Sequence, residues 1–355
     1  MLHHKEYPTI SKRQNLEKFA ISNNEYVNLD ISVDLSNLIE GVKFIVLSTF
    51  NDWKEEELEF SRFNDVVRCR NKTDERFEVV IRVYGKDSHI FVDRGQEIRN
   101  LLVLSKAGLS TPLYAKFKNG LVYGFVPGKS LTLENLKDPF ISAQIAKQLA
   151  KLHKVNIKDS CKEQILFRKI YSWLNKVPEK YTNPKKNKMF HQHFNLKQSK
   201  KRKAAYLECE VAKINSPIVF CHNDLLYTNI IYQEPEKKVS FIDYEHGSFN
   251  YRGFDIGLHF INFAGFHFDY SLYPKKDFQL VWLRHYLVSL HPEINIIEEQ
   301  VDELYREVSK FALVSLFYCS VWVLVIAEVT DLDFMQYAIK AMTVYYRQRD
   351  EIFAL

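Results

Sequence analysis

Up to about residue 127, apolar residues occur in short runs separated by turn residues. The run at 77–83, Phe-Glu-Val-Val-Ile-Arg-Val, is rich in β-branched residues and predicts a strand. Asp93 can cap a following helix that ends at Gly108, because glycine tolerates the backbone conformation found at helix ends. The first thirty residues are polar, and we assign them no fold. The pattern therefore predicts a strand followed by a helix.

A hairpin and then a change of pattern follow. The apolar runs at 113–117 and 121–125 lie on either side of Asn119-Gly120, which is typical of a tight hairpin turn. After Pro127 the apolar residues recur at spacings of three and four, as in 141–153, and predict helices. We therefore place a lobe boundary at this proline. The segments are 1–30 without an assigned fold, an N-terminal lobe at 31–126 and a C-terminal lobe at 127–355.

Within the C-terminal lobe the pattern predicts three short strands, at 217–220, 230–232 and 239–242. Amphipathic helices are predicted further on, at 280–287 and 301–312. The stretch 311–327 carries no charge over 17 residues, which is close to the lower limit for a membrane span. It also contains hydroxyl-bearing side chains such as Ser315 and Ser320, so a buried core helix is favoured over a membrane span.

Composition narrows the class of protein. The chain has 355 residues, 46% hydrophobic and 26% charged, as expected for a globular protein with about two domains. The net charge is +5, but the segment 183–203 holds eight basic and no acidic residues, so no basic surface spans the whole chain and nucleic-acid binding is not expected. This segment is either a localisation or polyanion-binding signal or a solvated insertion between helices, and the second is favoured.

Five widely spaced cysteines without a CxxC pair argue against a disulfide framework and against a zinc site. They favour a reducing compartment. The N-terminus lacks the apolar core of a secretory signal, so we expect a cytoplasmic location.

A polar constellation follows the predicted strands. Asp224 lies in His222-Asn-Asp, Asn229 comes five residues later, and Asp243 ends the strand at 239–242. Phosphoryl transfer needs a carboxylate that accepts the proton of the substrate hydroxyl, and Asp224 is the candidate base. Mg²⁺ prefers hard oxygen ligands, which Asn229 and Asp243 offer. The alternative is an ordinary polar loop, and His222 is expected to fix the backbone through hydrogen bonds.

Three motifs then point to a family: Cys221-His-Asn-Asp-Leu-Leu-Tyr-Thr-Asn-Ile-Ile-Tyr232, Phe241-Ile-Asp-Tyr-Glu245 and Asn250-Tyr-Arg-Gly-Phe-Asp-Ile-Gly257. They closely resemble the choline/ethanolamine kinase family, from about residue 40 to the C-terminus. The resemblance implies an α+β, two-lobed protein-kinase-like fold, with a small antiparallel sheet and one helix in the N-terminal lobe and a larger, mainly helical C-terminal lobe. Asp255 would be a carboxylate that receives loop hydrogen bonds without touching the substrate.

Within the family, Phe263-Ala-Gly265 and Asp269-Tyr-Ser-Leu-Tyr-Pro274 look like the ethanolamine-kinase branch. The implied reaction transfers the ATP γ-phosphate to ethanolamine, the first step toward phosphatidylethanolamine. Its cofactors are ATP and Mg²⁺, with Asp224 and Asn229 catalytic and Asn229 and Asp243 on the metal. A homodimer is one possible assembly.

The resemblance also implies binding residues for both substrates. In the N-terminal, nucleotide-binding lobe, Arg82 would contact the nucleotide phosphates, Glu97 would pair with it, and Asn64 would lie in the loop that covers the nucleotide. In the C-terminal lobe the amine would meet Glu245 and Asn262, with aromatic faces from Trp322 and Tyr337 that attract a cation. Each of these two rings, taken alone, would more often be a core residue on a helix.

Departures from the family pattern keep alternatives open. Ser61 stands where the nucleotide-covering loop has glycine, which would let backbone amides approach phosphates, and Phe63 stands at its threonine. Asn262 replaces a glutamate near the amine, and Leu258 and Cys319 replace an asparagine and an aromatic residue. The alternatives are a catalytically impaired pseudoenzyme with a binding or regulatory role, or a kinase for choline or another amino alcohol.

Overall fold

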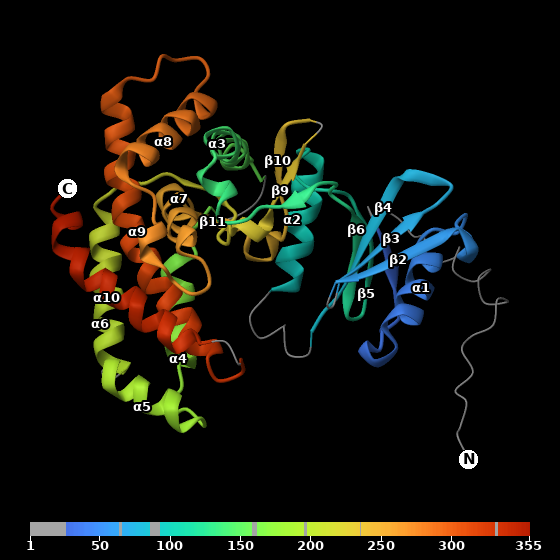
Figure 1. Ribbon diagram of the computed structural model, residues 1–355, viewed down its shortest axis with the longest axis horizontal. Coiled ribbons are helices and arrows are strands. Elements are labelled where there is room, and N and C mark those ends of the chain that lie inside the picture. Colours follow the sequence, from blue (N-terminus) through green and yellow to red (C-terminus); the bar gives the residue numbers. More distant parts are fainter. Residues whose placement is uncertain are drawn as a thin grey trace. The chain divides into compact units, whose positions relative to one another are not determined.

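The computed structural model describes residues 26–63, 66–85, 93–157, 162–194, 197–234, 236–330 and 333–355 (Figure 1). The chain divides into two compact units, which meet in the sequence at Val126 and Pro127.

The first unit is built on a six-stranded sheet with the order β1-β5-β6-β4-β3-β2. Its strands pair antiparallel except β1, which runs parallel to β5. The bounds are β1 Val27–Leu29, β2 Leu58–Phe63, β3 Val66–Asn71, β4 Asp74–Val83, β5 Leu113–Phe117 and β6 Gly120–Gly124, with helices α1 Leu38–Thr49 and α2 Arg94–Lys106.

The strand expected at 77–83 is confirmed within β4, and the helix after Asp93 is confirmed as α2. The Asp93 side chain accepts a hydrogen bond from the Gln96 amide and so caps the helix. Gly108 follows α2 with a φ of +69°, as expected for a helix end.

Two elements of this unit were not predicted. Helix α1 adds a second helix to the single one expected, and it buries Val42, Ile45 and Val46 against the sheet. Their spacing of three and four is a helical signal in the sequence, but it is short and follows a polar segment. Strand β1 lies within the segment 1–30 that was given no fold, because three residues paired with β5 leave no distinctive pattern.

The hairpin prediction is confirmed, but its turn lies one residue earlier. Gly120 already pairs with Phe117 in the β5–β6 ladder, so the loop is Lys118-Asn119. The Asn119 side chain bonds both backbone groups of Val33, at 2.9 and 2.8 Å. A Cβ atom at position 120 would lie 2.2 Å from the Arg82 carbonyl oxygen and from the Phe117 ring. The glycine is therefore needed for close packing rather than for the turn.

Ser61 and Phe63 lie in a strand rather than in a loop, and a place of this segment over the nucleotide stays a prediction. Both belong to β2, where Ser61 pairs with Arg68 and Phe63 with Val66. Phe60 and Leu58 alternate with the polar residues of the strand, and this two-residue period gives a paired strand. Asn64 lies outside the described residues.

The second unit contains two small sheets and eight helices within its described residues. Strand β8 (Ile218–Cys221) pairs with β11 (Ser248–Tyr251), and the order in the other sheet is β10-β9-β7. The remaining bounds are β7 Lys129–Ser130, β9 Ile230–Gln233, β10 Lys238–Phe241, α3 Pro139–His153, α4 Leu166–Lys176, α5 Pro184–His193, α6 Lys197–Ala212, α7 Arg252–Ile261, α8 Lys276–Leu290, α9 Glu298–Ile326 and α10 Phe334–Phe353. The three predicted strands are confirmed as β8, β9 and β10.

Helix α9 forms the core of this unit, with α7 and α10 packed against it (Figure 1). It joins the predicted helix 301–312 and the charge-free stretch after it into one helix, because no glycine or proline interrupts them. By length and composition this helix alone, within the part of the chain that the structure describes, could cross a membrane, but 78% of its most apolar window is buried in the fold. The prediction of a core helix is confirmed.

Two glycines bring α7 close to α9. A Cβ atom at Gly253 would lie 2.4 Å from the Phe311 ring, and one at Gly257 would lie 2.8 Å from the Ala312 amide nitrogen. The two glycines are four residues apart, so they share one face of α7. This close packing fixes the position of α7 against α9. Helix α7 carries Asp255.

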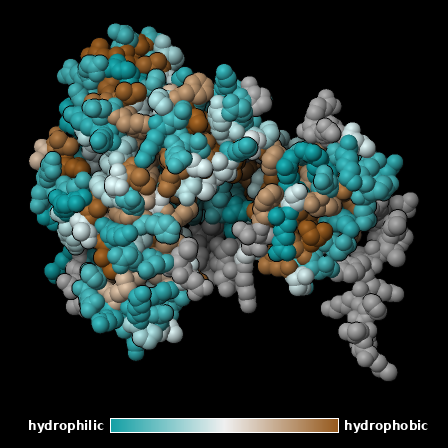
Figure 2. Space-filling model, viewed as in Figure 1, coloured by the Kyte–Doolittle hydropathy of each residue, from teal (hydrophilic) through white to brown (hydrophobic). Residues whose placement is uncertain are grey.

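The basic segment 183–203 does not lie between helices, because it forms α5 and the beginning of α6. Most of its described residues are exposed, as expected for a solvated segment. Asn183 caps α5 through the amides of Lys185 and Lys186, and Phe190 is buried, with the Lys200 ammonium 4.3 Å from its ring centre. The surface of this unit near α5 is mostly hydrophilic on the face shown in Figure 2.

Candidate active site

Asp224 lies in the loop that leaves β8, and the backbone before it is held in an unusual conformation. Asn223 has a φ of +62°, in the left-handed region that asparagine tolerates better than most residues. Its side-chain nitrogen donates to the carbonyl oxygens of His246 and Ser248, at 3.1 and 3.2 Å, and its side-chain oxygen accepts from Asn250. The turn that presents Asp224 is therefore tied to the segment around β11.

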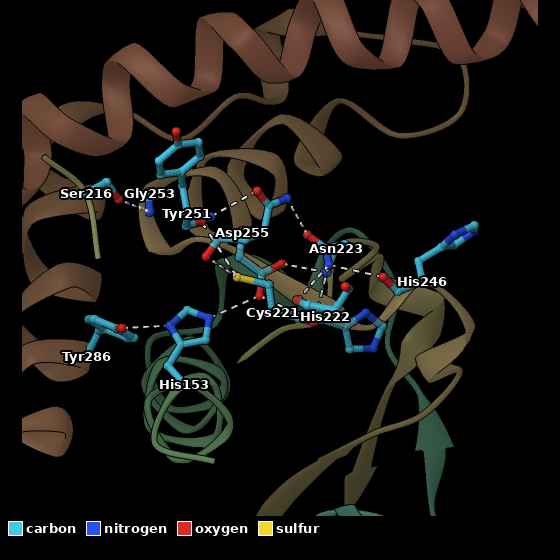
Figure 3. A network of polar contacts seen from close by, with 12 residues as sticks. His153, Ser216, Cys221, His222, Asn223, His246, Tyr251, Gly253, Asp255 and Tyr286 are labelled. Carbon is cyan, nitrogen blue, oxygen red and sulfur yellow. Dashed lines mark hydrogen bonds and ion pairs between the residues drawn. The ribbon is translucent and has the colours of Figure 1, made fainter. Parts of the chain in front are cut away.

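Asp255, on α7, anchors the same loop from inside the unit (Figure 3). It is fully buried, and its two carboxylate oxygens accept the amides of His222 and Asn223 at 2.8 and 2.7 Å. This confirms the expectation that Asp255 receives loop hydrogen bonds. Burial by itself would raise the pKa of Asp255, but the hydrogen bond from His153 and these amides outweigh it and lower the pKa.

His153 completes the anchor and was not predicted. Its Nε2 lies 3.1 Å from an Asp255 oxygen, and its Nδ1 lies 2.7 Å from the Tyr286 hydroxyl (Figure 3). Possible metal-ligand atoms of His153, Cys221 and Asp255 lie within 4.8 Å of one another. Both Asp255 oxygens already accept hydrogen bonds, however, so the arrangement is best described as a buried polar network. It links α3, α7 and α8 to the Asp224 loop.

Asn229 and Asp243 are brought beside Asp224 by the β9–β10 pairing. Asn229 precedes β9 and accepts the Ile242 amide at 3.0 Å, which places it opposite the end of β10. Its side-chain nitrogen donates to the Asp224 carbonyl oxygen at 2.9 Å and lies 3.4 Å from the Asp224 carboxylate. The three predicted residues therefore meet at the ends of adjacent strands.

The two histidines near this loop are neutral and hold backbone groups. His222 bonds the Ile242 carbonyl oxygen at 3.0 Å, directly before Asp243, and burial lowers its pKa. This agrees with the prediction that His222 fixes the backbone. His259 bonds the Leu225 carbonyl oxygen at 3.1 Å, directly after Asp224, and burial lowers its pKa to about 4.

The carboxylates of the site strongly affect one another. Burial, and then the negative charges of Asp243 and Glu245, raise the pKa of Asp224 well above its ordinary value. Lys169, on α4, acts in the opposite direction and favours the ionised form. Sequence reasoning missed Lys169, although a lysine near the buried face of an amphipathic helix was a visible signal.

A partly open cavity of about 120 Å³ lies beside Asp224, between α4, α7, α9 and α10. Among the residues that line it are Asp224, Asn262, Trp322 and Tyr337, so four of the predicted site residues meet there. Glu245 is not among the lining residues. Further rings that sequence reasoning missed complete the wall: Trp173, Phe266, Tyr318 and Phe334.

Two features of this cavity bear on its ligand. Asn262 is 7% exposed, and its side-chain nitrogen has no hydrogen-bond partner among the described residues. The ring centres of Trp173 lie 4.7 Å from Tyr318 and 4.9 Å from Trp322, so several aromatic faces cluster along one wall. Such a cavity suits a small ligand with an apolar or cationic end and a polar end.

The residues expected to bind the nucleotide lie in the first unit. Arg82 and Glu97 form an ion pair with 3.7 Å between the guanidinium and the carboxylate. Glu97 is buried and also accepts hydrogen bonds from Arg94 at 2.9 Å and from the Tyr84 hydroxyl at 3.2 Å. The predicted pair therefore exists, within a larger group that includes an arginine the sequence analysis did not single out.

The residues around Asp243 fit a divalent cation of the hard, oxygen-preferring kind. Asn229 uses its side-chain nitrogen toward Asp224, which leaves its amide oxygen as the donor atom. Asp243 adds a carboxylate, and its φ of +64° sets its orientation directly after β10. Oxygen donors from an amide and a carboxylate are the usual protein ligands of Mg²⁺, so we find the donor set suited to that ion.

Comparison with known proteins supports the same interpretation. Residues 58–346 match the model of the choline/ethanolamine kinase family. The chain belongs to this family. Human ethanolamine kinase 2 is 34% identical over 333 residues, which cover 92% of this chain and 85% of the human protein.

Other family members agree in sequence and in fold. The ethanolamine kinase of Drosophila melanogaster is 38% identical over 289 residues, which cover 78% of this chain and 55% of the fly protein. A solved ethanolamine kinase from Plasmodium vivax superposes with a TM-score of 0.80 at 25% identity, covering 97% of this chain and 95% of that one. The two-lobed kinase-like fold predicted from the sequence is therefore confirmed.

Proposed function

We propose that the protein is an ATP-dependent ethanolamine kinase, which forms phosphoethanolamine. One observation carries the proposal: Asp224 lines an aromatic-walled cavity and at the same time contacts Asn229, next to Asp243. The Asp224 carboxylate is therefore the candidate base, lies next to the candidate metal ligands and borders the cavity that suits a small cation. The relatives named ethanolamine kinase support the choice of substrate.

In this proposal Asp224 accepts the proton of the substrate hydroxyl as that oxygen attacks the γ-phosphorus of ATP. The bond from the γ-phosphorus to the β–γ bridging oxygen breaks, and ADP leaves. When bound, Mg²⁺ offsets the charge of the phosphate oxygens. Asn229 and Asp243 would hold that ion, and the Asn229 side chain also keeps the Asp224 loop in position. Burial makes Asp224 a stronger proton acceptor than an exposed aspartate.

The amine end of the substrate is assigned to the cavity. Trp322 and Tyr337 supply aromatic faces, and a cation over such a ring gains about 0.5 to 2 kcal/mol. The unpaired side-chain nitrogen of Asn262 is a donor, so only the side-chain oxygen of Asn262 could accept a hydrogen bond from the ammonium group. Glu245 lies close enough to affect the Asp224 charge and adds to the negative potential that attracts an ammonium group.

The nucleotide is assigned to the first unit. Arg82, held by Glu97, would contact the ATP phosphates, and Asn64 would lie in the covering loop. A cytoplasmic location, a homodimer and a role in phosphatidylethanolamine synthesis stay predictions.

A coupled assay of ADP release tests the proposal, with ethanolamine, choline and other amino alcohols as acceptors. We expect turnover to be fastest with ethanolamine and Asp224→Ala to be slower by roughly 100-fold or more. Fastest turnover with choline would change the substrate. If the wild type and Asp224→Ala release ADP at the same background rate with every acceptor, the kinase proposal is wrong and the pseudoenzyme alternative is favoured.

A further inference from the structure

Lys169 is a cation of the site that has no assigned role. It lies on α4, is half-buried, and comes four residues before Trp173. Residues four apart share one face of a helix, and Trp173 lines the cavity together with Asp224. The helical register thus directs Lys169 toward the same side of the unit as the candidate base.

The surroundings of Lys169 are acidic, but no fixed partner holds it. The carboxylates that act on its charge are Asp224 and Glu245, and both favour its ammonium form. Within the described ranges, no hydrogen bond or ion pair to its ammonium group is formed. Burial lowers the pKa of Lys169 to about 8, so the side chain is still protonated in most molecules at pH 7. A partly buried ammonium with three unused donors is therefore available to a ligand.

The position of Lys169 argues for an anion as that ligand. Lys169 is not among the described residues that line the aromatic cavity, where a second cation would repel the substrate amine. The Lys169 ammonium group interacts electrostatically with the carboxyl groups of Asp224 and Glu245. Asp224, Asp243 and Glu245 bring three acidic side chains to this point, and a phosphoryl group that arrives there adds negative charge. Phosphoryl transfer is accelerated by positive groups placed around the moving phosphoryl oxygens.

We propose that Lys169 is a further catalytic residue of the proposed kinase: its ammonium group donates hydrogen bonds to the phosphoryl oxygens during transfer and to the phosphate of the monoester product. The proposal rests on the proposed function. Lys169 neither gains nor loses a proton in the step. The new bond joins the substrate oxygen to the phosphorus, the old bond to the leaving ADP breaks, and the hydroxyl proton goes to Asp224.

The test compares Lys169→Met and Lys169→Arg with Arg168→Met as the matched control. Arg168 is the exposed neighbour on the same helix, so its variant removes the same charge from the same element. The first readout is binding of phosphoethanolamine by calorimetry, without nucleotide or metal. We expect Lys169→Met to bind it roughly tenfold or more weakly, because a charge-assisted hydrogen bond is lost. Arg168→Met should bind it like the wild type.

The second readout is steady-state kinetics with ethanolamine. Lys169→Met should lower kcat by about 100-fold, as expected for a group that acts on the transition state, while KM for ethanolamine changes little. Lys169→Arg should recover part of kcat, since it restores a cation. Thermal melting identifies a variant that fails to fold, and Lys169→Gln then serves as the neutral replacement.

The outcomes separate the two proposals. If the wild type phosphorylates ethanolamine and Lys169→Met matches it in kcat and in product binding, the role of Lys169 is wrong and the proposed function stands. An effect confined to the KM for ethanolamine would also overturn the role, because it would place Lys169 at the amine. If the wild type neither turns over an amino alcohol nor binds phosphoethanolamine, both proposals fail.

Discussion

Asp224, the proposed base, shows how a residue suited to chemistry can oppose stability. It is half-buried near Asp243 and Glu245, so the folded protein disfavours its charge. Because the folded-state pKa lies above the ordinary value of 3.8, the folded state binds the proton more tightly than the unfolded state. The free energy of unfolding therefore decreases as the pH rises from about 3.8 through the folded-state pKa.

This predicts that Asp224→Asn is more stable than the wild type and is inactive. The amide keeps the shape of the side chain and removes the buried charge, so the melting temperature should rise by a few degrees at pH 8. The gain should shrink toward pH 4, where the wild-type carboxyl is protonated. Melting curves at both pH values check this, with the exposed Asp52→Asn as control. A lower melting temperature of Asp224→Asn at pH 8 would contradict the argument.

At the scale of elements, the β5–β6 hairpin shows that a residue can be required for a reason other than the one its motif suggests. Asn119-Gly120 is typical of a tight turn, yet Asn119 binds the backbone of Val33 and Gly120 lies in the ladder. The side of Gly120 on which any other residue would carry a Cβ atom faces the Arg82 carbonyl oxygen. The glycine thus permits the close approach of β6 to the strand that carries a candidate nucleotide-binding residue.

Gly120→Ala should therefore destabilise the first unit. The added methyl group would meet backbone at Arg82 and the ring of Phe117, neither of which can move freely, and overpacking of this kind costs about 2 kcal/mol. Urea unfolding followed by fluorescence measures the loss. Lys118→Ala, an exposed change in the same loop, should alter the free energy of unfolding by less than about 0.5 kcal/mol. Equal unfolding midpoints for the two variants would show that position 120 tolerates a side chain.

At the scale of the whole molecule, the question is whether the protein binds Mg·ATP although Ser61 lies in a paired strand rather than in a glycine-containing loop. The proposed metal-binding residues are Asn229 and Asp243. A ligand that binds the folded chain and not the unfolded chain raises the melting temperature.

Mg·ATP should raise the melting temperature of the full chain. At a concentration 100 times Kd the stabilisation is about 2.7 kcal/mol, and EDTA should remove the part that depends on the metal. Asp243→Asn should show a smaller shift than the wild type at equal Mg²⁺, whereas Asn262→Ala, in the cavity wall, should keep the full shift. A flat response of the wild type at millimolar nucleotide would favour the pseudoenzyme alternative.

The amino-acid sequence by itself determined the fold class and the three residues that meet at the candidate base. These features are local: Asp224, Asn229 and Asp243 belong to one strand-loop-strand segment, and strand pairing brings them together. The period of apolar residues likewise predicted α3, α8 and α9, and the core position of α9. The same pattern tells which face of a helix is buried, but not what that face meets.

Only the tertiary structure decided the rest of the site. Trp173, Asp224 and Tyr337 line one cavity although long stretches of sequence separate them, because α4, α9 and α10 pack around the loop. Lys169 and the anchor from His153 to Asp255 depend on the same packing. The physical reason is that side chains from distant helices acquire shared burial and charge only once the core has formed, so no local spacing encodes their contact.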